Sequence, residues 1–195
     1  MKIIGITGSS GSGKTTVAKI LSEELKAKTI NADEIVRQMQ IEGTKYYEEI
    51  VRAFGAIILE KNGDLNRKKL AEIIFQDESK KEKIDNITYE YVVEEIKVKL
   101  KEIKEKYIII DAPLLIESKL NEICDIVIAV VSDKEDQIKR ICKRDDIEEK
   151  NAKMRIQAQK DNEFYKTNAD YIVENNGGEY DEFVGRVRKL VPKLQ

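Results

Sequence analysis

The chain has 195 residues, 41% of them hydrophobic, which suits one globular domain with a sizeable core and not a disordered chain. Its 35 basic and 37 acidic residues give a net charge of -2, too balanced for the basic face of a non-specific nucleic-acid binder. Because the sequence contains no histidine, histidine-dependent triads and zinc sites are excluded. A catalytic base must therefore be a carboxylate, a lysine or a water molecule.

The two cysteines, Cys124 and Cys142, are not spaced as a metal-binding or redox pair. We therefore expect reduced thiols and a cytoplasmic protein. No apolar run approaches the length of a membrane span, and the short apolar start KIIGIT does not fit a signal peptide. The sequence predicts small-molecule ligands, with neither a membrane nor a nucleic acid as partner, and it leaves the oligomeric state open.

The first elements in chain order surround a glycine-rich loop. Residues 2–7 form a short apolar run that predicts a buried strand, and residues 16–26 carry apolar side chains at helical spacing. Between them, residues 8–15 fit the full pattern G-x-x-x-x-G-K-[ST] of a phosphate-binding loop. A second short strand is predicted at 28–31 and a helix at 34–40.

The middle of the chain is predicted to be mostly helical. Asn66 is a candidate cap for the helix that begins after it, and apolar residues recur at helical spacing from Tyr89 to Ile103. Three strands and a final amphipathic helix follow, at 107–111, 125–131, 171–173 and 180–194. Strands that alternate with helices predict a parallel sheet covered on both faces, that is, an α/β fold.

The glycine-rich loop is predicted to hold the phosphates of a nucleotide. Its glycines let backbone N–H groups face phosphate oxygens, and the helix that begins near Lys14 adds its positive N-terminal end. Lys14 is expected to reach the outer phosphates, and the hydroxyl of Thr15 to ligate Mg²⁺. The predicted ATP-binding residues of the loop are Gly11, Ser12, Gly13, Lys14, Thr15 and Thr16.

Such a loop leaves three classes open: a small-molecule kinase, a GTPase switch, and an ATPase motor or module. The GTPase motifs D-x-x-G and N-K-x-D and the LSGGQ-like segment of transporter ATPases are missing from the sequence. A kinase needs a carboxylate near the acceptor hydroxyl, an acidic group near Mg²⁺, and arginines over the transferring phosphoryl group.

Candidates for all three kinase functions are present. Asp33 follows the second predicted strand and is a candidate for orienting the acceptor hydroxyl, or else a helix cap. Asp111 ends the 107–111 strand and is the candidate Mg²⁺ carboxylate, or else a strand-end cap. Gln137, Arg140 and Arg144 share one helix face, which fits either a lid over ATP or a solvated, salt-bridged helix.

Several segments taken together resemble the dephospho-coenzyme A kinase family along nearly the whole chain. The loop GITGSSGSGKTTVA is equally similar to that of uridine kinases, which stay an alternative, although their aromatic D-x-F-Y segment is missing here. The discriminating segments are NADEIVRQ (31–38), GDLNRKKL (63–70), DAPLLIE (111–117), QIKRICKRDD (137–146), Gln159, Ala169-Asp170 and Asn175-Asn176-Gly177. The family's His-Pro pair is replaced by Thr88-Tyr89, which puts local substrate contacts in doubt more than the reaction.

The resemblance implies Mg-ATP-dependent phosphorylation of the ribose 3′-hydroxyl of dephospho-coenzyme A, the last step of coenzyme A synthesis. ATP and dephospho-coenzyme A are then the small-molecule partners, with Mg²⁺ as the metal. The expected catalytic residues are Asp33, Lys14 and Arg140, and the further ATP contacts are Arg144 and Asn175. The expected substrate contacts are Asp33, Arg67, Leu114 and Glu117, and the expected metal ligands are Thr15 and Asp111.

The resemblance also implies an architecture in parts within a single kinase domain, residues 1–195. We expect a core like that of P-loop nucleoside triphosphate hydrolases, with a parallel five-stranded sheet, from residues 1–40 and 107–195. A mostly helical substrate subdomain is expected at 41–106 and a helical lid at 133–161. A nucleotide-binding regulatory module without turnover is the non-enzymatic alternative.

Overall fold

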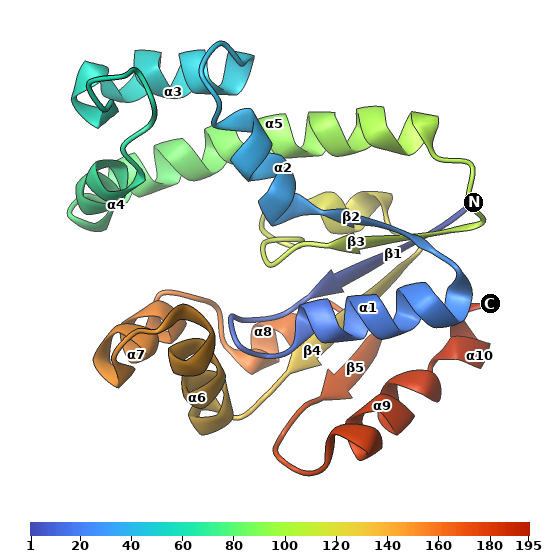
Figure 1. Ribbon diagram of the computed structural model, residues 1–195. Coiled ribbons are helices and arrows are strands. Elements are labelled where there is room, and N and C mark those ends of the chain that lie inside the picture. The colour runs from blue at the N-terminus through green and yellow to red at the C-terminus, as the bar shows by residue number, and fades with distance from the viewer. The chain divides into compact units, whose positions relative to one another are not determined.

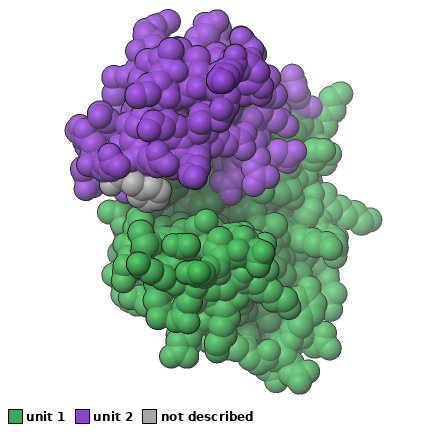
Figure 2. Space-filling model, turned by 60° about the vertical axis from the view of Figure 1, so that its left-hand side comes forward, with its two compact units in different colours: residues 1–31, 103–195 green, residues 32–102 purple. Residues whose placement is uncertain are grey.

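The computed structural model describes residues 1–195, apart from the side chain of Phe75. The chain divides into two compact units, drawn in green and purple in Figure 2. The first unit combines residues 1–31 with residues 103–195, and the second consists of residues 32–102. No described helix has the length and apolar character needed to span a membrane.

The first unit is built on a five-stranded parallel sheet with the strand order β2-β3-β1-β4-β5 (Figure 1). Its strands are β1 (Lys2–Thr7), β2 (Lys28–Asn31), β3 (Tyr107–Asp111), β4 (Ile126–Val131) and β5 (Tyr171–Glu174). In the central strands, Ile6 lies opposite Asp111 and Ile128, so the carboxyl ends of β1, β3 and β4 meet at one edge. The predicted strands and the α/β class are confirmed.

Helices cover both faces of this sheet (Figure 1). They are α1 (Lys14–Leu25), α9 (Tyr180–Arg188) and α10 (Val191–Leu194) on one face and α8 (Asn162–Thr167) on the other. The unit also contains α6 (Lys134–Asp145) and α7 (Glu149–Gln157), which pack on each other, and a short 3-10 helix, η2 (Leu120–Ile123). Val17 of α1 and Phe183 of α9 belong to the apolar core on one face, together with Ile128 of β4. On the other face, Tyr165 of α8 packs against Val131 of the same strand. Because β4 buries both sets of side chains, it reads as a continuous apolar run.

The second unit is helical. It contains α2 (Ala32–Met39), α3 (Lys45–Phe54), α4 (Arg67–Phe75), α5 (Glu78–Glu102) and the 3-10 helix η1 (Ala56–Ile58). Its apolar core includes Tyr46, Ile50 and Leu70. The predicted cap of α4 is confirmed, since the Asn66 side-chain oxygen accepts a hydrogen bond from the Lys69 N–H at 2.8 Å.

Two boundaries differ from those expected from the sequence. Helix α2 was placed in the core range 1–40, but it packs on α3 and α5, so the units divide between residues 31 and 32 and between residues 102 and 103. The single helix expected at 180–194 ends at Arg188 and resumes at Val191. Pro192 explains this break, because it has no N–H to bond the Arg188 carbonyl and its ring would clash there.

Candidate active site

The loop between β1 and α1 has a backbone that depends on glycine. Gly11 and Gly13 have φ angles of +75° and +101°, which L residues rarely adopt. A Cβ atom on Gly13 would lie 2.4 Å from the side-chain nitrogen of Asn175, and one on Gly11 would lie 2.7 Å from the carbonyl oxygen of Gln137. Glycine is therefore required at both positions for two reasons: the positive φ angle, and the lack of space for a Cβ atom beside the neighbouring residue.

Lys14 begins helix α1 at the end of this loop. Its side chain is buried, and its ammonium group donates a hydrogen bond to the Ser9 carbonyl at 3.0 Å. The ammonium charge thus lies across the loop, beside the N-terminus of α1 and its partial positive charge. A loop, a lysine and a helix N-terminus in this arrangement form a site for phosphate groups.

Thr15 and Asp111 are brought together, as the sequence predicts for the metal ligands. The Thr15 hydroxyl donates to the Asp111 carboxylate at 3.0 Å, and Asp111 is buried at the end of β3. Mg²⁺ prefers oxygen ligands and is usually held by one or two protein groups together with water and substrate phosphates. A hydroxyl and a carboxylate next to a phosphate loop therefore fit Mg²⁺.

Arg140 and Asn175 both contact the backbone of the loop. The guanidinium of Arg140, on α6, donates to the Gly11 carbonyl at 3.0 Å, to the Ser132 hydroxyl at 2.9 Å and to the Asn175 carbonyl at 2.8 Å. The Asn175 side-chain nitrogen donates to the Ser12 carbonyl at 2.8 Å. The structure places both residues at the glycine-rich loop, and their direct contacts with ATP stay predictions.

Arg144 is bonded within the predicted lid, residues 133–161. Its guanidinium donates to both carboxylate oxygens of Asp145, at 2.7 and 2.9 Å, and Arg155 of α7 donates to the same carboxylate. The hydrogen bonds from Arg144, and then those from Arg155, lower the pKa of Asp145 to about 2. The lid role and the contact of Arg144 with ATP are therefore still predictions.

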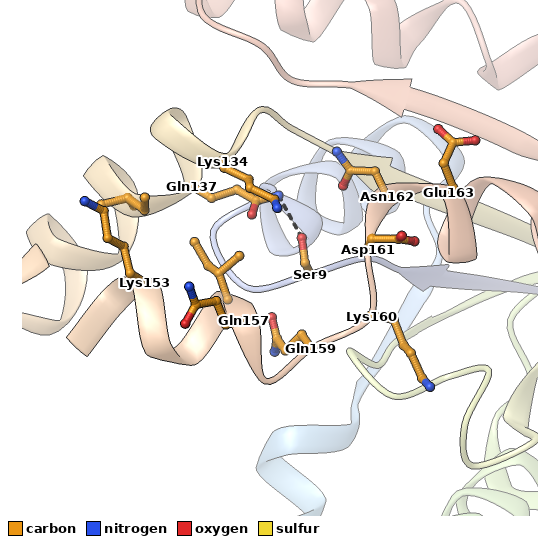
Figure 3. Close-up of a pocket in the computed structure, with 12 residues that line it drawn as sticks. Ser9, Lys134, Gln137, Lys153, Gln157, Gln159, Lys160, Asp161, Asn162 and Glu163 are labelled. Atoms are coloured by element: carbon orange, nitrogen blue, oxygen red, sulfur yellow. Dashed lines mark hydrogen bonds between the residues drawn. The ribbon is translucent and has the colours of Figure 1, made fainter. Parts of the chain in front are cut away.

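A cavity of about 680 Å³ lies beside the loop, between α6, α7 and the start of α8 (Figure 3). Ser9 forms its loop wall, and Lys134, Lys153 and Lys160 are among its lining residues. In Figure 3, Gln137 points to Ser9, and its amide nitrogen donates to the Ser9 hydroxyl at 2.8 Å. The cavity therefore borders the loop on the side of the predicted lid helices.

The predicted acceptor residues lie in both units. Asp33 is the second residue of α2 and Arg67 the first residue of α4, and both are exposed on the helical unit. Leu114 and Glu117 follow β3 in the first unit, where Leu114 is 41% exposed. The joint placement of these residues around one acceptor stays a prediction.

Sequence reasoning missed Ser132 and assigned no role to Gln159. Ser132 follows β4 and is fully buried, with its hydroxyl donating to the Asn175 carbonyl at 2.6 Å. The available signal was its place at the carboxyl end of an apolar strand, where ligand sites of parallel sheets form. The Gln159 side-chain oxygen accepts a hydrogen bond from the Ser10 N–H at 2.8 Å, a contact that no local pattern announces.

Known proteins resemble this chain along most of its length. The family model described as dephospho-CoA kinase matches residues 2–181. A dephospho-CoA kinase from Fusobacterium nucleatum is 43% identical over 182 residues, which cover 93% of this chain and 93% of that protein.

Solved structures give the same result for the fold. A dephospho-CoA kinase from Campylobacter jejuni has a TM-score of 0.67 and 29% identity, covering 100% of this chain and 98% of that one. A Thermus thermophilus protein, 24% identical, superposes with a TM-score of 0.84 over 98% of this chain and 96% of that one. The match of the family model over most of the chain and the 43% identical relative show that this chain belongs to the dephospho-CoA kinase family.

Proposed function

We propose that this protein transfers the γ-phosphoryl group of ATP to the ribose 3′-hydroxyl of dephospho-coenzyme A. The observation that carries the proposal is the combination of Lys14, Thr15 and Asp111 at one phosphate loop in a chain of this family. Such a loop alone also suits uridine kinases and regulatory nucleotide-binding modules. The family match over residues 2–181 favours dephospho-coenzyme A as the acceptor.

The ATP side of the reaction belongs to residues 11–16. Their backbone N–H groups wrap the β-phosphate, and Lys14 leaves the Ser9 carbonyl to bridge the β- and γ-phosphates. Phosphoryl transfer needs little covalent chemistry from the protein, so positioning and charge neutralisation supply most of the acceleration. Arg140 and Arg144 are proposed to add positive charge over the transferring group when the lid closes.

Thr15 and Asp111 are the residues that would hold Mg²⁺. When bound, Mg²⁺ neutralises negative charge on the phosphate oxygens. The Thr15 hydroxyl donates to Asp111 at 3.0 Å, so the two oxygens are neighbours. Asp111 is held by its place in β3, opposite Ile6 and Asn31 of the flanking strands.

The acceptor side is assigned to Asp33, with Arg67, Leu114 and Glu117 as substrate contacts. Asp33 accepts the proton of the 3′-hydroxyl as the hydroxyl oxygen bonds to the γ-phosphorus. The bond between the γ-phosphorus and the bridging oxygen breaks, and ADP leaves with that electron pair. Arg67 suits a phosphate group of the substrate because its planar guanidinium can make paired hydrogen bonds.

A cytoplasmic location also belongs to the proposal. It is supported by the two cysteines, Cys124 and Cys142, which are free thiols in the structure. Burial raises the pKa of Cys124 to about 12, so its thiol stays protonated and unreactive at neutral pH.

The test is a phosphate-transfer assay with Mg-ATP and three conditions: dephospho-coenzyme A, uridine or no acceptor. The release of ADP and the mass of the product are followed together. We expect dephospho-coenzyme A to gain one phosphate and little ADP to form without acceptor. Transfer to uridine alone would support a nucleoside kinase, and bound ATP with no transfer to either acceptor would support a regulatory module.

A further inference from the structure

The outer side of the phosphate loop is bonded to side chains from three separate parts of the first unit. Gln137 donates to the Ser9 hydroxyl, Gln159 accepts from the Ser10 N–H, Arg140 donates to the Gly11 carbonyl and Asn175 donates to the Ser12 carbonyl, at 2.8, 2.8, 3.0 and 2.8 Å. Every residue from Ser9 to Ser12 thus has a partner outside the loop. We call Gln137, Arg140, Gln159 and Asn175 the loop collar.

Three members of the loop collar, Gln137, Arg140 and Asn175, are joined to one another through Ser132. The Ser132 carbonyl accepts a second hydrogen bond from Gln137 at 2.9 Å, and its hydroxyl accepts one from Arg140 at 2.9 Å. The same hydroxyl donates to the Asn175 carbonyl at 2.6 Å. Because Ser132 is fully buried at the end of β4, this network is anchored to the sheet and not to the surface.

The collar dictates which way the loop peptides face. In a trans peptide, the carbonyl of one residue and the N–H of the next point in opposite directions. Asn175 holds the Ser12 carbonyl on the outside, so the N–H of Gly13 is turned away from the collar. Arg140 likewise holds the Gly11 carbonyl on the outside, and the Ser12 N–H donates within the loop to the Ser9 carbonyl at 3.3 Å. The collar therefore leaves the Gly13 N–H facing the side where a phosphate would bind.

We propose that Gln137, Gln159 and Asn175 are positioning residues that hold the phosphate loop in its phosphate-receiving conformation before the nucleotide arrives. A loop without them would have to be ordered by ATP itself, and that ordering would weaken binding. The proposal rests on the proposed function in one respect, that ATP is the nucleotide. Arg140 belongs to the same collar, but its separate proposed role at the phosphoryl group makes it unsuitable as a test. Asn175 is also a predicted ATP contact, so the decisive variants are those of Gln159.

The amide side chains of Gln159 and Asn175 allow a specific test, because Gln159 accepts a hydrogen bond from the loop and Asn175 donates one to it. Gln159 accepts from an N–H, so Gln159→Glu keeps the bond, whereas Gln159→Leu removes it. Asn175 donates to a carbonyl, so Asn175→Asp replaces a bond with a repulsion between oxygens. A purely steric role would instead treat the two acidic substitutions alike.

The measurement is the Kd of the full-length protein for Mg-ATP, by calorimetry, together with amide exchange of the Ser10 N–H. We expect Gln159→Leu to bind Mg-ATP about five- to tenfold more weakly and to exchange Ser10 faster. Gln159→Glu is expected to keep the slow exchange and, after correction for its charge, to stay within about twofold of the unmodified protein. Asn175→Asp is expected to lose at least as much affinity as Gln159→Leu. The KM for the acceptor should not change in any of them.

Three control variants separate the effect of the bonds from the effects of the added charge and of the apolar change. Gln157→Glu places the same charge two residues away on an exposed side chain, and Gln157→Leu controls for the apolar change. Asn176→Asp is the control beside Asn175, because Asn176 uses its side-chain oxygen as an acceptor from the Asp133 N–H and keeps that bond. All three controls should match the unmodified protein apart from a common charge effect.

The proposal is overturned if Gln159→Leu binds Mg-ATP as tightly as the unmodified protein, or if Gln159→Glu loses as much as Gln159→Leu once Gln157→Glu is subtracted. Either result would leave the proposed function standing. Conversely, a protein that binds Mg-ATP with the expected variant pattern but phosphorylates no dephospho-coenzyme A would support the loop collar and refute the proposed function.

Discussion

The two halves of the proposed reaction are built differently. In the first unit, Lys14 and Asp111 are buried, and both bond to the loop or to its first helix. In the helical unit, Asp33 and Arg67 are exposed on the first turns of α2 and α4. The difference teaches that the residues proposed for the nucleotide are held by hydrogen bonds within one unit, whereas Asp33 and Arg67, proposed for the acceptor, are exposed to solvent.

The largest effect on catalysis is expected from a substitution at the phosphate loop. Lys14→Ala removes the charge that the loop places beside the phosphates, and we expect kcat/KM to fall roughly 10³- to 10⁵-fold, the scale of charged groups that stabilise phosphoryl transfer. Steady-state kinetics with varied ATP would measure it. Lys19→Ala, on the exposed side of the same helix, is the matched control and should leave kcat/KM unchanged. A Lys14→Ala enzyme with near-normal turnover would remove the lysine from the mechanism.

The next effect tests whether the two halves are separate. Asp33→Asn should lower kcat about 10²- to 10⁴-fold, since a positioned base is lost. The Kd for Mg-ATP, measured by calorimetry, should stay unchanged because Asp33 is assigned to the acceptor. Glu34→Gln in the same helical turn is the control. If Asp33→Asn turns over normally, the assigned role is wrong, and if it weakens ATP binding, the division between the halves is wrong.

A smaller effect is expected at the metal ligands. Thr15→Val keeps the shape of the side chain but removes the hydroxyl that lies 3.0 Å from Asp111. The Mg²⁺ concentration for half-maximal activity should rise roughly 10- to 100-fold, as for a lost hydrogen bond or ligand to a charged group. Thr15→Ser retains the hydroxyl and should behave like the unmodified enzyme. Equal Mg²⁺ dependence of the Val and Ser variants would exclude Thr15 as a ligand.

The smallest expected effect is on the free energy of unfolding. Glycine-to-alanine substitution should lower it at Gly13 and raise it at Gly185. Gly13→Ala meets a φ of +101° and the Asn175 side-chain nitrogen at 2.4 Å, so unfolding in urea should show a loss of about 1–2 kcal/mol. Gly185→Ala lies inside α9 with no atom within 4 Å of the new Cβ, and should gain about 0.4–1 kcal/mol. If both variants lost the same free energy of unfolding, the positive φ angle and the close neighbour of Gly13 would not explain its loss.

Local patterns predicted much of this molecule. The strand at 28–31, the Asn66 cap and the Thr15–Asp111 pair all follow from short-range rules, since each depends on periodicity, on capping or on where a parallel strand ends. The phosphate-loop motif at residues 8–15, which contains Lys14, could also be predicted because it is a local pattern.

The hydrogen bonds of the loop collar could not be predicted from local sequence patterns. Its hydrogen bonds join residues 128 to 163 positions apart, and only the folded sheet decides that Gln159 faces Ser10 or that Asn175 faces Ser12. The shared helix face of Gln137 and Arg140 gave a partial signal, because both face the loop. The predicted subdomain range, 41–106, differs from the compact unit 32–102 because α2 follows β2 directly, and only the packing of α2 on α3 and α5 assigns it to that unit.

The wide separation of the loop from its collar has a consequence for biosynthesis. The ribosome makes the phosphate loop long before it makes residues 137, 159 and 175, and strands β3 to β5 must also be added first. During that interval the emerging loop lacks the hydrogen bonds that the collar makes to it. If the collar orders the loop as proposed, a growing chain acquires tight nucleotide binding only when nearly all of the first unit has been synthesised.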